Sequence, residues 1–226
     1  MKRTLILISL TMLMSMVVGK AFALSQGDQQ QVGQLWYEVV STSGNGANLN
    51  ANVKVIRKDS YSSLSGDIDI PAHPWQPSKK GNTYVIAIDE SAFSGCSNIS
   101  SIIIPETVTS IGASAFSGCS SLTSITIPNT VTSFATSVFS GCSGLTSITI
   151  TSSVTSIKAS AFSGCTSLTS IAIPSSVTSI ASSAFSGCSG LTTMTVDAAN
   201  TKYSSPSNSN CIVETSSKTL ICLVLK

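Results

Sequence analysis

The chain has 226 residues, of which 42% are hydrophobic and only 10% are charged, and its formal net charge is +2. Within residues 91–196 the only charged side chains are Glu106 and Lys158. There is thus no basic stripe for binding nucleic-acid phosphates and no basic amphipathic helix for a membrane surface. We expect neither a nucleic-acid partner nor insertion into a membrane.

The first 23 residues have the pattern of a secretory signal peptide. Lys2 and Arg3 form a basic start, residues 5–18 are an apolar run, and residues 21–23 (Ala-Phe-Ala) form a small-x-small cleavage site. The apolar run is shorter than a membrane-spanning helix requires. The sequence therefore predicts a secreted or cell-surface protein whose signal peptide is removed after Ala23, which leaves a net charge near −1.

Residues 24–63 are predicted to form an N-terminal β cap. Residues 35–40 and 53–56 are rich in β-branched and aromatic side chains, and a Gly-Asn-Gly turn region at 44–46 lies between them. A hairpin here would cover the open end of the structure that follows.

A 23-residue period dominates the centre of the chain. The tetrapeptide Phe-Ser-Gly-Cys begins at positions 93, 116, 139, 162 and 185. A fixed period of this length is typical of a solenoid, in which each unit buries its apolar face against its neighbours. Within a unit, Leu-x-x-Ile-x-Ile predicts a short strand with one buried face. Val-x-x-Ile predicts a second extended segment, and Phe-Ser-Gly-Cys a tight corner.

About six units occupy residues 64–197, and the first of them contains an insertion at 72–84. Insertions into solenoids become loops on one face, which is often the functional face. Trp75 lies in this insertion and is a candidate loop contact, because exposed aromatic side chains make good binding anchors. The alternative is that Trp75 only packs within its own loop.

The repeat resembles the BspA-like (Treponema-type) leucine-rich repeat of bacterial surface proteins. The matching motif is Leu-x-x-Ile-x-Ile-Pro-x-x-Val-x-x-Ile-x-x-x-Ala-Phe-x-x-Cys, over roughly residues 64–197. The resemblance implies a β-rich solenoid with short parallel strands and hairpin-like caps at both ends. It also implies a role in adhesion to host proteins or in co-aggregation, and it makes residues 198–226 a C-terminal cap.

Two strand-like segments in this C-terminal region, 211–213 and 220–225, suggest a hairpin. Cys211 and Cys222 would lie on its two strands, and in a secreted protein they are candidates for a disulfide.

The outward positions of the predicted strands form a surface rich in serine and threonine. These positions lie between the buried isoleucines, and such a face could bind an extended extracellular protein or a glycan through its hydroxyl groups. The candidate residues are Asp67, Asp69, Ser101, Ser124, Thr126, Ser147, Thr149, Ser170, Thr193 and Thr195.

Two other functions remain open at this stage. The protein could be a structural surface antigen without a fixed ligand. It could also be an ice-binding protein, because flat threonine arrays on β-solenoids can order water. The column that suggests this consists of Thr109, Thr132, Thr155 and Thr178.

Catalysis and cofactor binding are not expected. His73 is the only histidine, and the chain has no Gly-x-Ser-x-Gly motif for a nucleophilic serine. Five of the seven cysteines occupy one position of the repeat, where they could form a metal ladder or act as small buried hydrophobic residues. The second role is favoured because no cysteine pair has zinc-site spacing. We therefore predict a monomeric binding protein without enzymatic activity, metal or cofactor.

Overall fold

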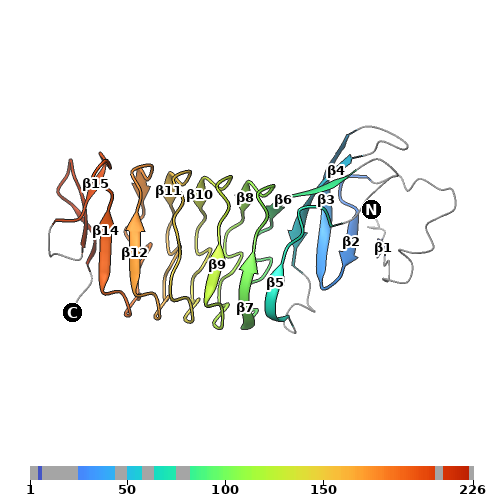
Figure 1. Cartoon of the computed structure of the whole chain (residues 1–226), viewed down its shortest axis with the longest axis horizontal. Coiled ribbons are helices and arrows are strands. Elements are labelled where there is room, and N and C mark those ends of the chain that lie inside the picture. Colours follow the sequence, from blue (N-terminus) through green and yellow to red (C-terminus); the bar gives the residue numbers. More distant parts are fainter. Residues whose placement is uncertain are drawn as a thin grey trace.

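The computed structural model describes residues 5–6, 25–43, 50–57, 64–74, 82–206 and 211–223. Its N-terminal end is an antiparallel sheet of β2 (Gln29–Val32), β3 (Leu35–Ser43) and β4 (Asn50–Ile56). β1 (Leu5–Ile6) pairs with β2 and lies within the predicted signal peptide, the rest of which is outside the described residues. β4 then pairs in parallel with β6 (Thr83–Ile88), so the predicted N-terminal hairpin leads directly into the repeats (Figure 1).

The repeats form two series of short, mostly parallel-paired strands on opposite sides of the molecule (Figure 1). The described residues contain no helix. We call the first series the front ladder: β5 (Ser65–Asp69), β7 (Asn98–Ile103), β9 (Ser124–Thr126), β12 (Ser170–Ile173) and β14 (Thr193–Val196). The second, the rear ladder, contains β6, β8 (Ser110–Ile111), β10 (Ser133–Phe134), β11 (Ser156–Ile157) and β13 (Ser179–Ile180).

In every strand pair within the two ladders except β5–β7, the paired residues are 23 residues apart in the sequence. Ser101 pairs with Ser124 and Ser170 with Thr193 in the front ladder, and Ser133 pairs with Ser156 in the rear ladder. One passage of the chain through both ladders is called a coil below. Equivalent side chains of successive coils therefore lie beside one another along the long axis of the molecule.

The Phe-Ser-Gly-Cys corners are held by hydrogen bonds from each coil to the next. The Phe93 amide donates to the Ala115 carbonyl at 2.7 Å, and the Gly95 amide donates to the Ser117 carbonyl at 2.7 Å. Gly118 adopts a φ of 74°, which L side chains rarely adopt. This explains why glycine recurs at the corner.

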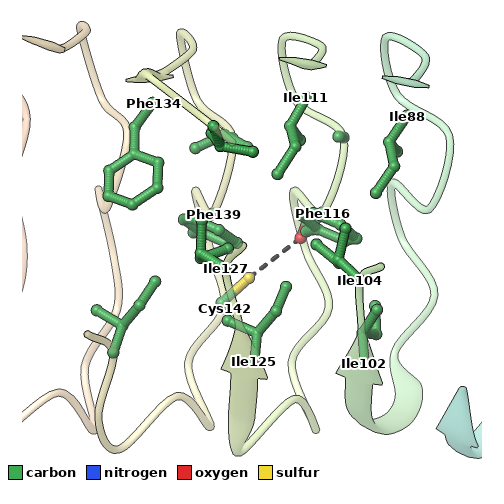
Figure 2. Close-up of a cluster of buried hydrophobic side chains, with 14 of the residues drawn as sticks. Ile88, Ile102, Ile104, Ile111, Phe116, Ile125, Ile127, Phe134, Phe139 and Cys142 are labelled. Carbon is green, nitrogen blue, oxygen red and sulfur yellow. Dashed lines mark hydrogen bonds between the residues drawn. The ribbon is translucent and has the colours of Figure 1, made fainter. Parts of the chain in front are cut away.

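A column of phenylalanines runs through the core between the ladders. Phe93, Phe116, Phe139, Phe162 and Phe185 stack with ring centroids 5.4–5.6 Å apart. Phe134 stands where the other coils have isoleucine, and its ring meets those of Phe139 and Phe162 edge-on at 5.8 and 5.4 Å (Figure 2). Aromatic stacking thus joins each coil to the next at the centre of the core.

The repeat cysteines lie beside this column as hydrogen-bond donors. The thiols of Cys119, Cys142 and Cys165 donate to the carbonyl of the phenylalanine 26 residues earlier, at 3.1–3.2 Å. Figure 2 shows the bond from Cys142 to Phe116. Burial raises the pKa of Cys119 and of Cys165 from an ordinary value of 9.0 to about 12, and that of Cys142 also rises. At this position of the repeat, cysteine thus packs as a small apolar residue and also donates a hydrogen bond from its thiol to a backbone carbonyl.

These buried thiols should be almost inert while the chain is folded. Because only the thiolate reacts, we expect alkylation of Cys119, Cys142 and Cys165 at pH 8 to be about a thousandfold or more slower than in denaturant. Above the ordinary thiol pKa of 9.0, unfolding releases these protons, so stability should fall as the pH rises from about 9 towards about 12. Timed alkylation with mass spectrometry measures the first effect, and labelling of the folded protein at the denatured rate would contradict it. Denaturation at a series of pH values measures the second effect, and a stability that does not change between about pH 9 and about pH 12 would contradict it.

The C-terminal end is a small antiparallel sheet of β15 (Tyr203–Ser204), β16 (Cys211–Glu214) and β17 (Leu220–Leu223). Asn200 and Tyr203 connect this sheet to the last coil. The Asn200 side-chain amide donates to the carbonyls of Pro174 and Val177 at 2.9 and 3.0 Å. The Tyr203 hydroxyl accepts the Ile180 amide at 2.8 Å.

The backbone of the predicted cysteine pair lies on the two strands of this hairpin. Cys211 is opposite Leu223, and Ile212 is opposite Cys222, so the two cysteines hold neighbouring rather than facing register positions. The side chain of Cys222 is outside the described part of the structure, and the disulfide stays a prediction.

Candidate functional site

The front face, defined as the outward side chains of the front ladder and of residues 147–150, matches the alternation expected from the sequence. Ile102, Ile125 and Ile171 are buried, as is Met194 at the equivalent position. Of the ten candidate residues, nine are exposed and Ser101 is half-buried, so the whole set is accessible to a ligand. The side chains therefore face outward as expected, whether or not their backbone forms a strand.

The charged end of the front face lies on β5 and β7. Asp67 accepts hydrogen bonds from the hydroxyls of Ser100 and Ser101 at 2.9 and 2.6 Å, and these bonds lower the pKa of its carboxyl group. Asp69, two residues along β5, is exposed. Ser100 was not among the predicted residues. Its contact with Asp67 could not be inferred from the alternation of side chains, because it depends on a register shift between Gly66 and Asp67.

Ile103 is a second residue that the candidate set omits. Its register partners are Asp69 on one side and Thr126 on the other, and 55% of its surface is exposed. The equivalent positions in later coils are Thr126, Thr149, Ala172 and Thr195. The sequence could have indicated Ile103 as a contact residue, because it is the one large apolar side chain at an outward position where later coils have threonine or alanine.

The middle of the front face departs from the prediction, because residues 147–150 do not form a strand. Ser147 and Thr149 are exposed as expected, but they lie between the sheets β5–β7–β9 and β12–β14. The residue that follows is Thr151, where the coils on either side have Pro128 and Pro174. Proline holds the residue before it in an extended conformation, and this coil lacks that restraint.

The insertion in the first unit is described only at its two ends. Trp75, the predicted loop contact, lies outside the described residues. The Nδ1 atom of His73 lies 2.6 Å from the carbonyl of Thr83, and the ring of His73 meets that of Tyr84 edge-on. His73 thus anchors the start of the insertion to β6.

The threonine column considered for ice binding uses its hydroxyl groups within the protein. The hydroxyls of Thr109, Thr155 and Thr178 donate to backbone carbonyls of the preceding coil at 3.2–3.3 Å. The hydroxyl protons of these threonines are therefore engaged in holding coils together rather than directed at water.

A metal site requires clustered ligand side chains, and a helical membrane span requires a long apolar segment. In the part of the chain that the structure describes, no three His, Cys, Asp or Glu side chains come together as a metal site. The described segments likewise include no helix of the length and apolar character needed to span a membrane.

The fold and the exposed front face define a leucine-rich repeat protein. Residues 86–214 match six copies of the BspA type leucine rich repeat region, and the chain belongs to this family. The family is generally one of surface or binding proteins rather than enzymes. No curated protein shows a significant sequence match to the chain.

The solved structures similar to the chain include the following three. A leucine-rich cell surface protein of Faecalibacterium prausnitzii is 34% identical over 78% of this chain and 42% of its own, with a TM-score of 0.63. The leucine-rich repeat protein of Treponema pallidum is 27% identical over 63% of each chain, with a TM-score of 0.56. The pneumococcal vaccine antigen PcpA, at 20% identity over 89% of this chain and 57% of its own, shares the fold with a TM-score of 0.66. The chain thus spans less than half the length of the first and less than two thirds of the others.

Proposed function

We propose that the protein is a secreted or cell-surface recognition module that binds an extracellular protein or glycan through its front face. The observation that carries the proposal is the exposure of the predicted face residues along the front ladder, while the alternate side chains are buried. Similarity to a cell-surface protein of the same family supports the location. We further propose that the repeats are a solenoid of 23-residue units and that the signal peptide is removed after Ala23.

The front face is suited to binding because its side chains are short and already ordered by the strands. Hydroxyl groups of serine and threonine lose little conformational entropy on contact, and each can donate and accept a hydrogen bond. The face carries carboxylates only at Asp67 and Asp69, so its polarity changes along its length. A ligand that is itself charged at one end can therefore bind in one preferred orientation along the face.

The test is binding of the secreted protein to a panel of immobilised matrix proteins and mucin glycans. A Thr126→Lys/Thr149→Lys variant should fold normally, since both residues are exposed, and should lose saturable binding by about tenfold or more. A Thr132→Lys/Ser179→Lys variant is the matched control, because it adds the same charge at two exposed positions of the rear ladder and its margin. This control should bind as the unmodified protein does.

Comparison of the two lysine variants distinguishes a binding site on the front face from a general effect of added charge. Equal losses in both lysine variants would show a general effect of charge and contradict a site on the front face. Absence of saturable binding to every member of the panel would instead favour a structural surface protein without a fixed ligand.

A further inference from the structure

Ile103 is an exposed apolar side chain at the charged end of the front face. Among the described residues, Ile103 and Leu220 are the large hydrophobic side chains with more than half of their surface exposed. Ile103 lies on β7 between Asp69 of β5 and Thr126 of β9. It can be buried only by something that covers the front face, because its backbone already pairs with strands on both sides.

The carboxylates beside Ile103 have no basic partner among the described residues. Lys54, the basic residue of β4, pairs with Glu38 and Asp89, and Arg57 donates to the carbonyls of Ser91 and Ser94. Asp67 is held by serine hydroxyls, which orient a negatively charged group without neutralising it. The surface therefore combines an oriented carboxylate, a second carboxylate and an apolar contact.

The spacing of these groups suits an extended polypeptide. Asp67 and Asp69 alternate on one strand, so their side chains lie on the same face about 7 Å apart. An extended segment that lies over the face would place its own alternate side chains at the same spacing. A segment aligned along the boundary of β5 and β7 would direct two basic side chains at alternate positions to the carboxylates on β5. The apolar side chain of the residue between them would point the other way, to β7, and cover Ile103, which is the register partner of Asp69.

We propose that the charged end of the front face, formed by Asp67, Asp69 and Ile103, is the docking site for an extended protein segment with two alternating basic side chains and an adjacent apolar side chain. This inference rests on the proposed function, and it narrows the ligand from any protein or glycan to a basic, apolar peptide. Charge complementarity draws the segment to this end of the face, and Ile103 holds it there.

The test uses three labelled peptides of about 12 residues that differ only at two alternating positions, which carry lysine, glutamine or glutamate. All three have valine between these two positions and serine or threonine elsewhere. Fluorescence anisotropy with the secreted protein should show binding of the lysine peptide about tenfold tighter than of the glutamine peptide, with the glutamate peptide weakest. Raising the salt from about 0.05 M to about 0.5 M should reduce the difference between the lysine and glutamine peptides.

Variants then place the site. Ile103→Thr, which introduces the residue that later coils carry at this position, should weaken binding of the lysine peptide about tenfold. Asp69→Asn should abolish most of the preference for lysine over glutamine. Leu220→Thr is the matched control, because it makes the same change at the other large exposed hydrophobic side chain among the described residues, in the C-terminal sheet, and should leave binding unchanged.

The contrary outcomes are distinct from a failure of the proposed function. Panel binding that is lost in Thr126→Lys/Thr149→Lys, together with no binding of the lysine peptide, would overturn this inference and leave the recognition module intact. Peptide binding that Ile103→Thr and Leu220→Thr affect equally would also overturn it. The insertion at 72–84 carries two lysines of its own, Lys79 and Lys80. Tighter peptide binding by a Lys79→Gln/Lys80→Gln variant would show that these lysines compete for the carboxylates, and would overturn the inference of a separate protein partner.

Discussion

Replacement of Phe139 by alanine is expected to lower the free energy of unfolding by about 4 kcal/mol, within the usual range for a fully buried phenylalanine. Phe139 has no exposed surface, and its ring stacks on those of Phe116 and Phe162 at 5.6 and 5.5 Å. Phe134 meets the same ring edge-on. The substitution therefore removes three aromatic contacts and leaves a cavity that the rigid coils on either side cannot easily close.

The position of the cavity should matter as much as its size. Phe185, at the end of the column, stacks on one ring only and is slightly exposed, so Phe185→Ala should cost less than Phe139→Ala. In a repeat array each unit contacts mainly its neighbours, and a central defect should also separate the unfolding of the two halves. Urea denaturation followed by circular dichroism measures both effects. Equal losses for the two variants would contradict the role of stacking on both sides, and Ile103→Ala serves as an exposed control.

The alternation of apolar and polar residues predicted much of the fold and of the candidate face. The Leu-x-x-Ile-x-Ile pattern was enough to place Ile125 inside and Thr126 outside, because a period of two leaves one choice of face once the apolar side is buried. The spacing of Phe-Ser-Gly-Cys likewise predicted the stacked corners. These features follow from local patterns that repeat in every unit.

Features that depend on the neighbouring coil were not predictable in this way. Ser91, Ser114 and Ser137 adopt a φ of 55°, although nothing in their Ser-Ala-Phe or Ser-Val-Phe context indicates a left-handed conformation. The amides of these three serines each donate to a carbonyl of the following coil. Ser160, at the next corner, adopts the same φ of 55°. Ser183, in the last corner, is not among the residues with positive φ. Here the strain is imposed by the stack rather than by the local sequence.

The capping role of Asn200 also depends on the neighbouring coil and could not be predicted from the local sequence. In the repeats, the hydroxyls of Ser153 and Ser176 donate to the carbonyls of Val131 and Val154 in the preceding coil, at 3.0 and 2.7 Å. The equivalent carbonyl in the last coil belongs to Val177, and its donor is Asn200. Asn200 thus supplies with a side-chain amide the hydrogen bond that serine hydroxyls supply to the preceding coils.

Asn200→Ala is therefore expected to lower the free energy of unfolding by about 3 kcal/mol, because it removes the side-chain donor to two carbonyls at the end of the array. The carbonyl oxygen of the Asn200 side chain also accepts the amides of Lys202 and Tyr203, each at 2.9 Å. Loss of this acceptor detaches the C-terminal sheet from the last coil. Hydrogen exchange should accordingly rise first at residues 170–181 and 203–204, before the central coils respond.

Two further variants separate the donor function of Asn200 from its acceptor function. Asn200→Asp keeps an acceptor for Lys202 and Tyr203 but places a carboxylate against the carbonyls of Pro174 and Val177, so at pH 7 it should destabilise the protein at least as much as alanine does. Tyr203→Phe removes a single bond, to the Ile180 amide, and should cost about 1 kcal/mol. If Asn200→Asp were as stable as the unmodified protein, the donor bonds to the last coil would not be what closes the array. The order Asn200→Asp, Asn200→Ala, Tyr203→Phe, from least to most stable, follows directly from the number and polarity of the backbone groups that each change leaves without a partner.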